Sequence, residues 1–166
     1  MQACRIALAV AVGGLTASAA GAADKPPLCD FLEKVRAGSA NEFAALRGEG
    51  ERDIFLNKYP GTLVPEPNVT CSIHRDGQKD SYDCAGTWAS MAELKSTFER
   101  YASALPVCYP KMAFKRGANG SEATHNEQRF ISGGDRHVHL EVTATDFSKL
   151  GSGYIFGLLI ELPMSK

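Results

Sequence analysis

The sequence predicts an α+β fold. We expect a two-layer sandwich in which an antiparallel sheet of about four to five strands carries two main helices on one face. Apolar residues repeat at helical spacing in two segments, alternate with polar residues in several short segments, and are separated by Gly-rich turns. The expected order, α-β-β-α-β-β-β, favours an antiparallel sheet with its helices on one side.

The first helical segment follows Pro26-Pro27. Its apolar residues at helical spacing are Phe31, Leu32 and Val35. Gly38 interrupts the pattern, and residues 39–42 (Ser-Ala-Asn-Glu) have the form of a capping box that starts a second helical turn. We therefore expect one kinked helix or two short ones. Residues 49–67 contain two Gly and three Pro, which predicts a long connection.

A β-hairpin is predicted over residues 69–86. Apolar and polar residues alternate in 69–74 and again in 81–86, and Asp76-Gly77 between them is typical of a turn. If Ile73 faces Tyr82, then Cys71 faces Cys84. Directly opposed strand residues lie close to the separation that a disulfide requires, so this register predicts a Cys71–Cys84 bond.

The second helix begins with a capping box, Ser90 to Glu93. Its apolar stripe consists of Leu94, Phe98, Tyr101 and Leu105, and we expect this stripe to face the sheet. Pro106 is expected to end the helix. Cys108 follows and reaches Cys29 if the two helices pack side by side. The predicted second disulfide is therefore Cys29–Cys108, although two other pairings of the four cysteines remain open.

The remaining chain is predicted to be β-structure. Residues 112–115 start a strand, 117–121 form a loop, 124–131 form a polar strand, and 132–135 form a turn. Residues 138–145 alternate like a half-buried antiparallel strand. Residues 154–162 are nearly all apolar, so we expect this strand to be central or covered on both faces.

The first 23 residues have the pattern of a cleaved signal peptide. Arg5 precedes an apolar stretch, 6–15, and residues 20–23 offer small-x-small cleavage sites. We expect residues 24–166 to form a single disulfide-bonded domain in the periplasm or outside the cell. Cys4 leaves with the signal, and an oxidising compartment favours two disulfides among the other four cysteines.

Composition excludes some partners. The chain has 18 Lys+Arg and 19 Asp+Glu, and loss of Arg5 leaves 17 against 19, a net charge of −2. No cluster of basic residues is present, which argues against nucleic acid as a partner. No later apolar stretch is long enough to span a membrane. No motif implies a cofactor.

Two sets of residues are candidates for a functional site. His137, His139 and Glu141 alternate on one strand face and are of types that bind zinc or copper, although a solvated face of an amphipathic strand is the simpler interpretation. His74, Arg75, Asp76 and Lys79 lie near the hairpin tip. A disulfide-held loop there would present them to a protein partner at low entropic cost, or they only keep a turn soluble.

No nucleophile motif stands out, since Gly151-Ser152-Gly153 lacks the strand-elbow-helix context of a hydrolase. The favoured hypothesis is an exported, non-catalytic binding protein with a protein partner in the cell envelope, for example an inhibitor or immunity-type protein of an envelope enzyme. The alternative is a small periplasmic hydrolase, or a protein that binds a metal or small ligand with His137, His139 and Glu141.

Overall fold

The computed structural model describes residues 25–49, 58–75, 79–121, 126–134 and 138–163. The predicted signal peptide, residues 1–23, therefore lies outside the described residues. The helices are α1 (Pro27–Ser39) and α2 (Met91–Cys108), with short 3-10 helices η1 (Ala44–Leu46) and η2 (Ser148–Leu150). The strands are β1 (Lys58–Gly61), β2 (Val69–Arg75), β3 (Lys79–Trp88), β4 (Phe114–Ser121), β5 (Asn126–Gly134), β6 (His139–Phe147) and β7 (Gly153–Pro163).

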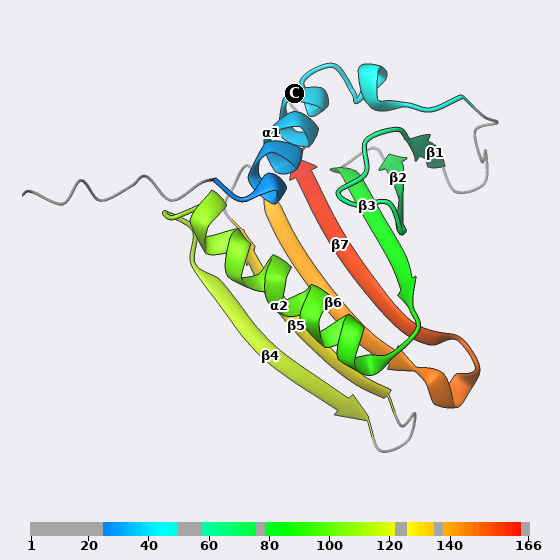
Figure 1. Ribbon diagram of the computed structural model, residues 1–166. Helices are drawn as coiled ribbons and strands as arrows, with labels where there is room; N and C mark the ends of the chain where they lie inside the picture. Colours follow the sequence, from blue (N-terminus) through cyan, green and yellow to red (C-terminus); the bar gives the residue numbers. More distant parts are fainter. Residues whose placement is uncertain (1–24, 50–57, 76–78, 122–125, 135–137, 164–166) are drawn as a thin grey trace, which may run out of the picture.

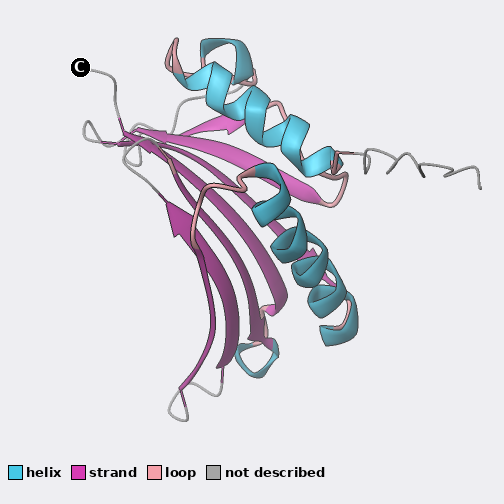
Figure 2. Cartoon of the chain, turned by 90° about the vertical axis from the view of Figure 1, so that its left-hand side faces the viewer, coloured by secondary structure: helices cyan, strands magenta, loops and turns pink. Residues whose placement is uncertain are grey.

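The strands form one seven-stranded antiparallel sheet in the order β1-β2-β3-β7-β6-β5-β4. The predicted fold class is wrong in this respect, because we expected only four to five strands. Both helices lie on the same side of the bowed sheet, and α2 runs along it (Figures 1 and 2). β3 pairs with β7, so the last strand sits in the middle of the sheet and joins the first three strands to the other three.

The sheet is larger than predicted because edge strands form in segments whose composition predicts loops. β1 contains Pro60 and Gly61, and β4 contains two glycines with no apolar alternation. Pairing with a neighbouring strand overrides these weak local preferences. At Gly117 of β4, a Cβ would lie only 2.6 Å from the ring of Phe130 on β5, so the ring covers the backbone that glycine leaves open.

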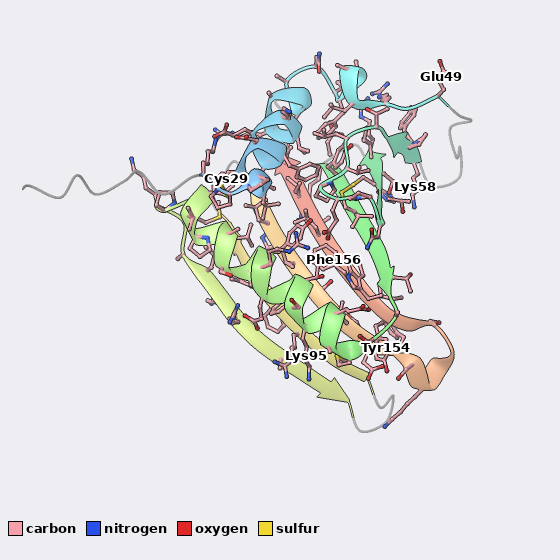
Figure 3. All side chains as sticks on the ribbon, in the orientation of Figure 1. Cys29, Glu49, Lys58, Lys95, Tyr154 and Phe156 are labelled. Atoms are coloured by element: carbon pink, nitrogen blue, oxygen red, sulfur yellow. A yellow bond between two sulfur atoms is a disulfide. The ribbon has the colours of Figure 1, made fainter. Side chains whose placement is uncertain are left out.

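The hairpin forms in the predicted register. Ile73 faces Tyr82 and Cys71 faces Cys84, whose Cα atoms are 4.0 Å apart and whose sulfurs are bonded. Cys29 and Cys108 form the other disulfide, with Cα atoms 5.0 Å apart, and tie the start of α1 to the end of α2 (Figure 3). The structure thus contains both disulfides that the sequence predicts.

The helix ends differ in part from the prediction. The capping box at Ser39 does not form, because the Ser39 hydroxyl donates to the carbonyl of Arg36 and the chain turns at Glu42 and Phe43, which have positive φ. At Ser90 the expected cap is present, since the Glu93 N–H donates to Ser90 Oγ. Pro106 does not end α2, because it falls within the last turn and removes only one helical hydrogen bond there.

The core lies between the helices and the sheet. The predicted stripe of α2 is buried: Leu94, Phe98, Tyr101 and Leu105 are each at most 3% exposed. Phe156 of β7 packs against Tyr101 with ring centroids 4.7 Å apart, beneath α2 (Figure 3). Tyr82 of β3 contacts the rings of Phe31 and Phe43, which bring α1 and its following turn onto the same core.

The burial of Phe98 yields a stability prediction. Because this side chain is 2% exposed, Phe98→Ala should lower the free energy of unfolding by about 3–5 kcal/mol in a denaturant titration. The control is Ser96→Ala, an exposed position on the same helix, which should change it by less than about 0.5 kcal/mol. A loss below about 1 kcal/mol for Phe98→Ala would contradict a well-packed core here.

The two disulfides should differ in their contribution to stability. Cys29–Cys108 closes a sequence separation of 79 and Cys71–Cys84 one of 13. Cross-linking restricts the unfolded chain more when the loop is longer, so removing the first bond should cost about 1.6 kcal/mol more than removing the second. Paired Cys→Ala variants compared by chemical denaturation test this, and equal losses would show that loop closure is not the dominant effect.

Candidate functional site

The face of the sheet that points away from the helices is the candidate site, and we call it the open face. Strand alternation separates it from the core: in β3, Tyr82 and Cys84 are buried while Ser81 and Asp83 point to the other side. Figure 2 shows no described element packed on this face. Within the described residues, the open face is therefore the large surface that the fold leaves uncovered.

The strand register aligns distant parts of the chain on the open face. One row across the sheet runs through residues that oppose each other in β2, β3, β7 and β6: His74, Ser81, Glu161 and His139. The next row consists of Ser72, Asp83, Leu159, Glu141, Ser132 and Lys115. Directly opposed side chains of an antiparallel pair lie about 5 Å apart at Cβ, so each row is a contiguous surface.

His74 lies in a small polar cluster at one end of this face. Its Nε2 atom is 3.3 Å from Ser72 Oγ and 3.8 Å from Asp83 Oδ2. A serine relay requires the hydroxyl at one ring nitrogen and the carboxylate at the other. Here both oxygens approach the same nitrogen, so the cluster does not have the geometry that activates a serine nucleophile.

A hollow of about 460 Å³ opens beside this cluster. Its open-face lining is formed by β1, β2 and β3 and comprises Lys58, Pro60, Thr70, Ser72, Asp83 and Ala85. The lining combines small apolar groups with both signs of charge. The hollow thus makes this part of the open face concave and lines it with both apolar and charged groups.

The centre of the open face is apolar. Leu159 and Ile155 of β7 and Phe130 of β5 are half-buried there, with Thr143 between them in the register. The sequence predicts that 154–162 forms a central or doubly covered strand. β7 is central, but no described element covers its second face. The apolar side chains on that face are therefore shielded from water only by neighbouring side chains of the sheet.

The predicted metal-binding residues are only partly brought together. His139 Nε2 lies 3.9 Å from Glu141 Oε2 on the open face, and His137 lies outside the described residues. Glu161 opposes His139 and pairs with Lys79, its carboxylate 3.4 Å from the Lys79 ammonium. Within the described ranges, no three His, Cys, Asp or Glu side chains form a group that could hold a metal ion.

The hairpin-tip residues fall on two faces. His74 and Lys79 project from the open face, whereas Arg75 points to the other side, and Asp76 lies outside the described residues. Arg75 Nε donates to Asp80 Oδ1 at 3.1 Å, and Arg75 Nη1 donates to Glu42 Oε2 at 2.7 Å. Both hydrogen bonds raise the pKa of Arg75, and the one to Glu42 has the larger effect.

Sequence reasoning missed the role of Asp80. This carboxylate is 5% exposed, and Arg75 is its partner in the ion pair. The alternation of 79–86 could have placed Asp80 on the core face with Tyr82 and Cys84. Arg75 therefore acts in part as the counter-charge of a buried acid.

The chain matches no protein-family model, no curated protein and no solved structure. Neither described helix combines the length and the apolar character that crossing a lipid bilayer requires.

Arg75 yields the next prediction. Arg75→Ala should lower the free energy of unfolding by about 2–4 kcal/mol at neutral pH, because it leaves the Asp80 carboxylate buried without its partner. The double variant Arg75→Ala with Asp80→Asn should recover part of that loss. His74→Ala, on the open face, should cost less than about 0.5 kcal/mol. Equal small effects for all three variants would show that the pair does not stabilise the hairpin.

Proposed function

We propose that this chain is an exported, non-catalytic protein that binds a protein partner through the open face of its sheet. The observation that carries the proposal is a sheet face that the described part of the fold leaves uncovered and that has an apolar centre beside charged residues. Protein interfaces have this anatomy, with a desolvated apolar centre and a polar rim. An inhibitor or immunity-type protein that acts on an envelope enzyme is one concrete form.

Two features of the open face support a protein partner. Three pairs of titratable groups lie on it: His74 with Asp83, Lys79 with Glu161 and His139 with Glu141. Polar and charged pairs at the rim favour orientation and selection of a partner over attraction of one type of ion. The disulfide of the hairpin points to the core face, so it fixes β2 and β3 without occupying the surface.

Export is part of the proposal and rests mainly on the sequence. Arg5, the apolar stretch 6–15 and the small residues at 20–23 together have the pattern of a signal peptide. Two disulfides are compatible with residence in an oxidising compartment. A partner in the periplasm or outside the cell follows from this placement.

Photo-crosslinking from the open face tests the proposal. A photoreactive phenylalanine at Ala85 or at His74, both on the open face, should give the same protein adduct in the envelope fraction of the native host. The same group at Lys34, exposed on α1, is the control and should not. Adducts from Lys34 alone, or equal adducts from all positions, would contradict the open face as the interface.

A substitution in the apolar centre of the open face tests the same proposal by a measurement of binding affinity. Leu159→Arg should weaken binding to the crosslinked partner at least about tenfold, equivalent to about 1.4 kcal/mol, since it places an unmatched charge in the contact. Lys34→Ala serves as the matched control, with folding of both variants checked by circular dichroism. If Leu159→Arg binds the partner with unchanged affinity, the interface lies elsewhere.

A further inference from the structure

A second hollow lies at the far end of the sheet from the His74 cluster, where β3 leads into α2. It has a volume of about 600 Å³, within the range of sites that bind small molecules. Its lining includes Trp88 at the end of β3, Asn68 before β2, and Glu93, Ser96 and Thr97 on the first turns of α2. Thr87 and Ala89 complete the lining. The Trp88 side chain is on the helix side of the sheet, so the aromatic wall of this hollow does not belong to the open face.

Trp88 forms a braced aromatic wall of this hollow. Its ring lies 5.3 Å from that of Phe156, which in turn packs on Tyr101 at 4.7 Å. Beneath the ring, a Cβ at Gly86 would approach Trp88 Cζ3 to 2.5 Å, so glycine is needed for the indole to lie across the strand. The half-buried ring is therefore held in place before any ligand arrives, which lowers the entropic cost of binding.

Apart from Ala89, the other side chains of the hollow are polar, and only that of Glu93 is an acid or a base. An amide from Asn68, the Ser96 and Thr97 hydroxyls and the Glu93 carboxylate supply both donors and acceptors of hydrogen bonds. The described lining contains no Lys or Arg, which argues against a phosphate or other anion. It also contains a single aromatic ring, whereas cages for quaternary ammonium groups use several.

We propose that this hollow binds one unit of a neutral saccharide. The C–H face of a pyranose ring is apolar and fits flat against an indole, and the hydroxyls at its edge both donate and accept hydrogen bonds. The Glu93 carboxylate accepts from two sugar hydroxyls or from one, and the Asn68 amide both donates and accepts. This site does not depend on the function proposed for the open face.

The sequence provides its own reporter for the test, because Trp88 is the only tryptophan in the chain. Tryptophan emission of the purified chain is followed while cellobiose, maltose or N,N′-diacetylchitobiose is added. At least one of these neutral sugars should shift the emission saturably. Choline chloride and inorganic phosphate are added in parallel and should leave it unchanged.

Matched variants locate the binding. Glu93→Gln keeps the capping-box residue type of α2 but removes the charge, and should weaken sugar binding about tenfold, since hydrogen bonds to a charged group are the strong ones. Glu33→Gln, exposed on α1, should bind like the parent. Ser96→Ala should weaken binding less than Glu93→Gln. Thermal unfolding of each variant shows whether it remains folded.

Three outcomes would overturn the proposal. The first is that none of the three sugars shifts the emission at millimolar concentration. The second is a saturable shift with choline instead, which would make the hollow a cation site. The third is a sugar response that Glu93→Gln and Glu33→Gln leave equally intact, which would place binding elsewhere on the chain.

Discussion

The pairing of β3 with β7 joins two antiparallel units, β1–β3 and β4–β7, into one sheet. Ten residue pairs, from Lys79↔Pro163 to Trp88↔Tyr154, define its register. Both helices pack over this junction: α1 through Phe31 on Tyr82, and α2 through Tyr101 on Phe156. The core, the open face and the hollow beside Trp88 all depend on these two strands lying side by side.

That register is fixed by packing and not by a covalent bond. A shift by one residue would move every side chain of β7 to the opposite face and bring Ile155, Leu159 and Glu161 beneath the helices. The disulfide Cys71–Cys84 holds β2 to β3, and Cys29–Cys108 holds α1 to α2, but neither reaches β7. Phe156, between Tyr101 and Trp88, is the aromatic contact that ties β7 to its neighbours.

Local patterns predicted the elements whose preferences agree with their surroundings. The hairpin register followed from alternation around one turn, and the α2 stripe followed from its spacing and from Ser90. β1 and the second half of β4, residues 117–121, were missed because Pro60 and the glycines of β4 lower strand propensity, and only a neighbouring strand compensates. The prediction that Pro106 ends α2 was wrong for a related reason, since a proline in the final turn of a helix destabilises it only slightly.

The candidate site, too, could be predicted only in part from local sequence patterns. Alternation alone separates His74 from Arg75, because consecutive strand residues face opposite sides of a sheet. Bringing His74 into one row with Glu161 and His139 requires β3, β7 and β6 to be neighbours, and no local pattern contains that order. The open face is consequently a product of topology. The opposite face, with the buried Asp80 and the hairpin disulfide, contributes to holding the fold together.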